Sequence, residues 1–213
     1  MADRSLQIRP IAGALGAEIA GVDLSEDLDD GTIAAIRHAW LDHLVIFFRD
    51  RELPPERLLA FARHFGEVIE YPFITGIEGF PVITPVVKLE HERVNFGGLW
   101  HSDTAYLERP PVGTMLIARE VPPFGGDTLF ANMYLAYETL SPGMQRLLHG
   151  LVAVNSSAKA DVTKTREDRL RDGARHDAKR EYVAPCIRSC APTRRPAERR
   201  STSIPATPCA SRT

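Results

Sequence analysis

Two residues near the middle of the chain, His101 and Asp103, have types and a spacing that can bind a metal ion. On an extended chain, residues two apart point to the same side, so the imidazole and the carboxylate would project together. They can then supply two corners of a 2-His-1-carboxylate facial triad, which leaves positions on Fe(II) open for other ligands. A bare His-x-Asp pair is more often a surface or turn feature than a metal site, so the surrounding sequence has to decide.

The sequence around this pair carries further motifs. Trp-His-Ser-Asp-Thr-Ala-Tyr at 100–106 is followed by Arg-Pro-Pro at 109–111 and by Pro-Pro-Phe-Gly-Gly-Asp-Thr-Leu-Phe at 122–130. Earlier in the chain stand GAEIAGVDL at 16–24, VIFFRD at 45–50 and FARHFGE at 61–67. With these motifs the chain, from about Leu6 to about Tyr182, resembles the taurine catabolism dioxygenase (TauD/TfdA) family of Fe(II)- and 2-oxoglutarate-dependent enzymes.

This resemblance implies a fold, a reaction and three site residues. The fold would be a double-stranded β-helix, also called a jelly roll. The protein would be an enzyme that uses Fe(II), with 2-oxoglutarate as cosubstrate and O2, to hydroxylate a small organic molecule, releasing succinate and CO2. His101 and Asp103 would be the first two iron ligands, and Thr128 would contact the carboxylate of 2-oxoglutarate.

The match fails where the substrate should bind. In taurine enzymes a His and a Tyr after the Phe-Gly-Glu segment hold the substrate, whereas the corresponding positions here lie near Tyr71 and Ile74. Taurine itself is therefore not the expected substrate. Phe73, Phe96 and the glycines that follow indicate a roomier, more apolar pocket. We expect Tyr71, Phe73 and Phe96 to contact a small anionic molecule of the taurine/sulfonate or aryloxyacid kind.

Other residues near the motifs have simpler interpretations. Trp100 and Tyr106 are expected to be core aromatics rather than substrate contacts. Gly125 and Gly126 are expected to serve the backbone geometry of a turn. The histidines of the first 66 residues fall in expected helices, where structural or surface roles are more common than metal binding.

The elements that position these residues fall into two parts. Apolar periodicity and helix-end signals predict strands and helices in the first part, at 6–10, 17–19, 45–48, after Asp29 and from Pro54 to Gly66. In the second part, short apolar runs between Gly and Pro predict strands at 80–87, 114–118 and 128–130, then helices at 134–140 and 144–148. We expect an α+β, mostly β, jelly roll with N-terminal helices, and a single dioxygenase domain over residues 1–183.

Composition sets broad limits. The chain has 213 residues and a formal net charge of -2, which gives no reason to expect nucleic acid or a membrane as partner. No apolar run is long enough to span a bilayer, and the first residues show no signal pattern, so a cytoplasmic location is expected. The expected partners are a small-molecule substrate and O2, and a homo-oligomer remains open.

The last thirty residues differ from the rest. Residues 184–213 contain six Arg, one Glu and all three cysteines, for a net charge of +5 that leaves -7 on the preceding residues. When codons compatible with this segment are read one base earlier, they can encode HPVVRTHPETGRKALYVN, which resembles the strand-rich segment that family members carry here. We expect a frameshift near Ala184 followed by an early stop, and a disordered, out-of-frame tail. The alternative is a natural basic tail.

A shifted frame would remove part of the site. Family members carry the third ligand, a second His, and an Arg for the far 2-oxoglutarate carboxylate in their C-terminal segment. The later histidines of this chain, His149 and His176, do not stand in a comparable context. We therefore expect the third ligand to be absent, the jelly roll to be incomplete at its C-terminus, and activity to be impaired. A non-catalytic truncated remnant and a cupin-like metal protein of other chemistry stay as alternatives.

Overall fold

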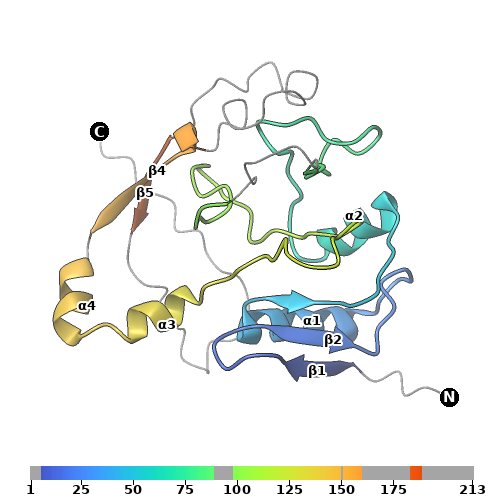
Figure 1. The fold of residues 1–213 in the computed structure, drawn as a ribbon, viewed down its shortest axis with the longest axis horizontal. Coiled ribbons are helices and arrows are strands. Elements are labelled where there is room, and N and C mark those ends of the chain that lie inside the picture. The colour runs from blue at the N-terminus through green and yellow to red at the C-terminus, as the bar shows by residue number, and fades with distance from the viewer. Residues whose placement is uncertain (1–5, 89–97, 150, 160–182, 189–213) are drawn as a thin grey trace. The chain divides into compact units, whose positions relative to one another are not determined.

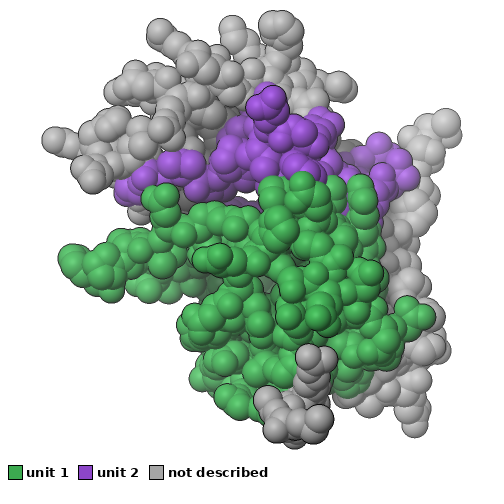
Figure 2. Space-filling view, turned by 90° about the vertical axis from the view of Figure 1, so that its right-hand side faces the viewer, with its two compact units in different colours: residues 1–66, 115–145 green, residues 67–114, 146–213 purple. Residues whose placement is uncertain are grey.

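The computed structural model describes residues 6–88, 98–149, 151–159 and 183–188. They belong to two compact units, coloured in Figure 2. Unit 1 comprises residues 1–66 and 115–145, and unit 2 comprises residues 67–114 and 146–213. Phe96 lies outside the described residues, as do residues 189–213 of the expected tail. The expected domain boundary near residue 183 stays a prediction.

Unit 1 begins with a small mixed sheet in the order β1-β2-β3, seen beside α1 in Figure 1. β1 (Gln7–Pro10) pairs antiparallel with β2 (Ala17–Ala20), and β2 pairs parallel with the short β3 (Ile46–Phe47). The turn between β1 and β2 closes at Gly16, whose φ of 98° favours glycine. All three strands were predicted from the sequence and are confirmed.

Helix α1 (Asp30–His43) packs against β2 and β3. Its first turn is capped by Asp29, whose side chain accepts a hydrogen bond from the Thr32 backbone N–H at 2.9 Å. Hydrogen bonds from Thr32 hold the pKa of the Asp29 carboxyl below its usual value. Ile33, Ile36 and Ala39 form the buried face of the helix, so its amphipathic pattern predicted both its existence and its orientation.

Helix α2 (Pro55–Arg63) completes the core of unit 1. Pro55 occupies the first helical position, where a missing N–H costs nothing. Phe61 is the buried residue of this helix, and its ring makes edge-on contacts with Phe48 and Phe65. The core that results joins buried side chains of the sheet, both helices and their connections: Ile19, Val22, Leu24, Ile33, Ile36, Ala39, Leu53 and Phe61.

After Gly66 the prediction is only partly right. The strands expected at 80–87, 114–118 and 128–130 are wrong, since these segments run as irregular chain. The helical pair is confirmed as α3 (Met133–Glu138) and α4 (Pro142–Leu148). Two features were missed: the 3-10 turn Ser157–Lys159, and β4 (Val152–Ser156), which pairs antiparallel with β5 (Val183–Arg188).

The described residues thus show an α+β arrangement with two small, open sheets of three and two strands. A strand needs a hydrogen-bonded neighbour along its length. In the described part of the 80–130 region, Phe80 and Ile83 make local turn bonds with Ile77 and with each other rather than a ladder with a second strand. The jelly roll therefore stays a prediction. None of the helices that the structure describes is both long enough and apolar enough to cross a membrane.

Candidate metal site

The structure brings His101 and Asp103 together in unit 2. His101 Nε2 lies 3.0 Å from Asp103 Oδ1. The chain turns immediately after Asp103, where Thr104 has a φ of 49° and its carbonyl accepts a hydrogen bond from the Leu107 N–H at 3.0 Å. A positive φ is uncommon for a β-branched residue, so the turn is held by its surroundings. The expected approach of the two side chains is confirmed.

Neighbouring groups orient both side chains. His101 Nδ1 lies 2.6 Å from the carbonyl oxygen of Leu99. Because a carbonyl can only accept, Nδ1 carries the hydrogen, and in the neutral ring Nε2 is left with its lone pair free for a metal. On the other side, the Thr114 hydroxyl donates to Asp103 Oδ2 at 2.7 Å. Asp103 therefore presents Oδ1 toward the imidazole while Oδ2 is already occupied.

The spacing of the two donor atoms fits an octahedral ion. Two ligands bound at about 2.1 Å and at a right angle are about 3.0 Å apart, which is the Nε2–Oδ1 separation found here. Ligands on a tetrahedral ion with bonds of this length are about 3.4 Å apart. The same 3.0 Å also suits a hydrogen bond between the two groups, which requires a hydrogen on Nε2 in addition to the one on Nδ1. Both side chains are about half exposed, at 51% and 50%, so an ion could reach them.

The pair formed by His101 and Asp103 offers two candidate ligands. Among the described residues, no group of three His, Cys, Asp or Glu side chains is arranged to hold a metal ion. One imidazole and one carboxylate match the chemistry of Fe(II) but make an incomplete facial triad. A third ligand would have to come from outside the described part of the chain.

An aromatic cluster in unit 2 includes two of the residues expected to bind substrate. Tyr71, Phe73 and Tyr106 form a chain of rings, with centroids 5.6 Å and 5.8 Å apart. Phe73 lies in the middle and is 2% exposed. Burial raises the pKa of the Tyr71 phenol, a hydrogen bond with Tyr106 lowers it, and the negative charge of Asp103 raises it again. The charge of Asp103, a candidate metal ligand, therefore acts on the Tyr71 phenol of this cluster.

Trp100 and Tyr106 were both predicted to lie in the core, and the two predictions have opposite outcomes. Tyr106 is 8% exposed and is confirmed as a core aromatic. Trp100 was also expected in the core, but it is 70% exposed, so that prediction is wrong. Trp100 lies directly beside His101 in irregular chain, where no sheet face or helix face directs its side chain inward.

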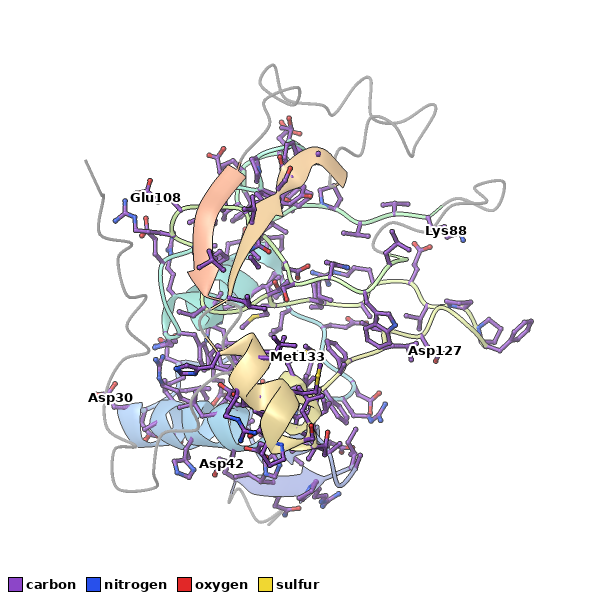
Figure 3. All side chains as sticks on the ribbon, turned by 90° about the vertical axis from the view of Figure 1, so that its left-hand side faces the viewer. Asp30, Asp42, Lys88, Glu108, Asp127 and Met133 are labelled. Carbon is purple, nitrogen blue, oxygen red and sulfur yellow. The ribbon has the colours of Figure 1, made fainter. Side chains whose placement is uncertain are left out.

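Thr128 lies in unit 1, whereas His101 and Asp103 lie in unit 2. It follows a turn at Gly125 and Gly126, whose φ values of 76° and 73° confirm that these glycines serve backbone geometry. Figure 3 labels Asp127, the residue before Thr128, on the extended segment that leads to Met133 at the start of α3. Thr128 is exposed there, and its contact with 2-oxoglutarate stays a prediction.

Sequence reasoning missed the residues that orient the pair. Thr114 was interpreted only as the start of a strand, and Leu99 contributes a backbone oxygen that its side chain does not reveal. Neither residue type carries a motif signal, so only coordinates could identify them.

Known proteins resemble this chain over most of its length. The family model described as taurine catabolism dioxygenase TauD, TfdA family matches residues 7–206. The alpha-ketoglutarate-dependent sulfate ester dioxygenase of Pseudomonas putida is 35% identical over 173 residues, which are 78% of this chain and 56% of that protein. An alkylsulfatase of Acinetobacter baylyi is 34% identical over 155 residues, 72% of this chain and 48% of that protein.

The backbone also resembles that of a solved structure. The crystal structure of a taurine dioxygenase from Burkholderia xenovorans superposes with a TM-score of 0.57 and 35% identity, covering 70% of this chain and 53% of that one. This chain spans about half the length of the relatives it matches. Since the family model extends over nearly all of the described elements and the backbone agrees, the chain belongs to the TauD/TfdA family of taurine catabolism dioxygenases.

Proposed function

We propose that this chain carries part of the active site of an Fe(II)- and 2-oxoglutarate-dependent dioxygenase, with His101 and Asp103 as iron ligands. The observation that carries the proposal is the 3.0 Å approach of Nε2 and Oδ1, because it is the separation of two adjacent ligands on an octahedral ion. The names of the relatives from Pseudomonas putida and Burkholderia xenovorans support the same chemistry.

The residues of this chain would bind and orient rather than react. His101 and Asp103 would hold the iron, and the cosubstrate and O2 would bind to the same ion. The Thr128 hydroxyl would donate a hydrogen bond to a carboxylate oxygen of 2-oxoglutarate. When bound, iron and 2-oxoglutarate together supply the oxidation: 2-oxoglutarate becomes succinate and CO2, one oxygen atom of O2 enters the succinate, and the other hydroxylates a C–H bond of the substrate.

The substrate we propose is a small organic sulfate ester or sulfonate. The Pseudomonas putida relative is named for a sulfate ester and the Acinetobacter baylyi relative for an alkylsulfate. In this chain the Tyr71 phenol can donate a hydrogen bond to an anionic oxygen, and it lies within electrostatic range of Asp103. Succinate formation with an alkyl sulfate, an alkylsulfonate and an aryloxyacid would separate the classes, and preference for the aryloxyacid would refute this assignment.

We further propose that the frameshift expected near Ala184 impairs the 213-residue chain, because the described residues hold only two candidate ligands and the family's third is expected after that point. Loss of one of three protein ligands weakens iron binding, and a half-exposed pair competes with water for the metal. The expected location of the missing ligand is the sequence that would follow Ala184 in the shifted frame. A truncated, non-catalytic remnant and an impaired enzyme differ in one measurable property, namely whether iron and 2-oxoglutarate still bind at His101.

Anaerobic titration of the purified chain with Fe(II) and 2-oxoglutarate tests the proposal through the visible charge-transfer band of their complex. We expect a weak band at high Fe(II) that disappears in His101→Ala, and a strong band after the frame near Ala184 is restored. Absence of a band in the restored protein would contradict the dioxygenase assignment. Iron binding that 2-oxoglutarate does not perturb would favour a cupin-like protein of other chemistry.

A further inference from the structure

We propose that Thr114 is a positioning residue that holds the Asp103 carboxylate with one oxygen, and not both, toward the metal, an inference that rests on the proposed role of Asp103 as a ligand. A carboxylate can bind an ion through one oxygen or through both. Its terminal torsion is broad, so an unsupported Asp side chain can rotate between the two modes. The contacts made by Asp103 in this structure remove that freedom.

The two oxygens of Asp103 have different neighbours. Oδ1 lies 3.0 Å from His101 Nε2, and Oδ2 accepts the hydrogen bond from the Thr114 hydroxyl at 2.7 Å. A neutral donor such as a hydroxyl leaves the negative charge on the carboxylate while occupying one oxygen. Oδ1 is then the oxygen left for a metal, and a one-oxygen contact keeps more positions on the ion open than a chelate would.

Threonine suits this role because its side chain is stiff. The β-branch restricts the first torsion, so the hydroxyl is held in place at little entropic cost. Residues 99–114 thus form a short, self-contained arrangement: the Leu99 carbonyl orients the imidazole of His101, and the Thr114 hydroxyl orients the carboxylate of Asp103. Groups of this kind behind a ligand typically change metal affinity about 10–100-fold.

The effect of Thr114 should lie near the lower end of that range. Thr114 is exposed and both ligands are half exposed, so water can partly replace the lost donor. We expect Thr114→Val, which keeps the shape of threonine and removes its hydroxyl, to weaken metal binding about tenfold. Thr114→Ser restores a hydroxyl and should regain most of that loss.

The test is an anaerobic Co(II) titration of the full 213-residue chain, followed by visible absorption, with Co(II) as a spectroscopic substitute for iron. Thr139→Val is the matched control, because it makes the same chemical change at a hydroxyl that donates to the Leu135 carbonyl at 2.9 Å. We expect a dissociation constant about tenfold higher for Thr114→Val, close to unchanged for Thr114→Ser and unchanged for Thr139→Val. Circular dichroism of each variant checks that the fold is retained.

Each alternative outcome has a distinct meaning. If His101→Ala and Asp103→Ala abolish Co(II) binding but Thr114→Val binds as well as the unchanged chain, the positioning role is overturned and the proposed ligands stand. If Thr114→Ser is as weak as Thr114→Val, the hydroxyl is not what matters, and the inference also fails. If His101→Ala does not affect Co(II) binding, or if neither the unchanged chain nor the frame-restored protein binds Co(II), the proposed metal site itself is refuted together with the role of Thr114.

Discussion

Replacing Phe73 with alanine should disrupt the aromatic cluster of unit 2 and leave the core of unit 1 intact. The ring is 2% exposed and contacts both Tyr71 and Tyr106. Truncating a buried Phe to Ala costs about 3–5 kcal/mol, whereas a whole domain is stable by only about 5–15 kcal/mol. Because the cluster has only Phe73, Ile74 and Tyr106 as its buried members among the described residues, this loss should open the cluster to water.

Tyr71 provides a local readout of that opening. Burial is the largest cause of its raised pKa, so hydration in Phe73→Ala should move the titration back toward the usual tyrosine value of about 10. Phenolate absorbance measured against pH would detect the change. The chain has five tyrosines, and Tyr71→Phe identifies which part of the signal belongs to Tyr71.

The raised pKa also predicts how stability varies with pH. The folded state retains the Tyr71 proton more tightly than the unfolded chain does. As the pH rises above about 10, the unfolded chain ionises first, so the free energy of unfolding falls until the folded-state phenol ionises as well. Urea unfolding on both sides of pH 10 should show this loss in the unchanged chain and a smaller one in Tyr71→Phe.

Shortening a buried side chain in unit 1 distinguishes a local effect on the Tyr71 pKa from a general loss of stability. Ile36→Ala removes a side chain that is fully buried in unit 1 and should cost about 2–5 kcal/mol. It should accelerate amide exchange in α1 without shifting the Tyr71 titration. An unchanged titration in Phe73→Ala, or an equal shift in Ile36→Ala, would refute burial in this cluster as the cause of the raised pKa.

Three further predictions follow from local geometry and from the tail. Gly76→Ala would place a Cβ 2.3 Å from the Pro81 carbonyl oxygen. It should lower the free energy of unfolding in urea by about 1–3 kcal/mol. Gly13→Ala is the control and should have little effect, because a Cβ at Gly13 would meet no atom within 4 Å. Asp29→Ala should speed amide exchange in the first turn of α1, and Asp29→Asn should not. Hydrogen bonding lowers the pKa of Asp29 in the folded state. The contribution of the Asp29 carboxylate to the free energy of unfolding is therefore complete above the usual Asp pKa and is lost as the pH falls through the lowered pKa. Restoring the reading frame near Ala184 should raise the strand content in circular dichroism and reduce aggregation in size-exclusion chromatography, because unpaired sheet edges promote association; no change would favour a natural basic tail.

The first 66 residues were predictable because their structure is encoded locally. In α1 the apolar spacing of Ile33 and Ile36 marks the buried face, and Asp29 marks the start by capping the helix. Pro55 and Gly66 bracket α2 in the same way. Each of these signals acts within a few residues, so a sequence pattern suffices to detect it.

The segment from residue 80 to 130 was not predictable on the same basis. An apolar run such as 114–118 has the composition of a strand, but a strand also requires a second strand to pair with. That second strand can come from any distant part of the sequence. Trp100 illustrates the same limit for burial, since a large aromatic is buried only where another element covers it. His101 and Asp103 were proposed as ligands because of the motifs around them, since a bare His-x-Asp pair is common, whereas Thr114 was indistinguishable from any other threonine.

The local contacts of the proposed ligands, His101 and Asp103, bear on what restoring the reading frame near Ala184 can change. The contacts that orient His101 and Asp103 come from Leu99 and Thr114, all within sixteen residues of sequence and within unit 2. The geometry of the two ligands therefore does not depend on a third ligand being present. Adding the third ligand should raise metal affinity without rearranging the pair. Thr114→Val should then raise the Co(II) dissociation constant by a similar factor in the 213-residue chain and in the frame-restored protein. If Thr114→Val has no effect in the frame-restored protein, the restored C-terminal sequence repositions Asp103.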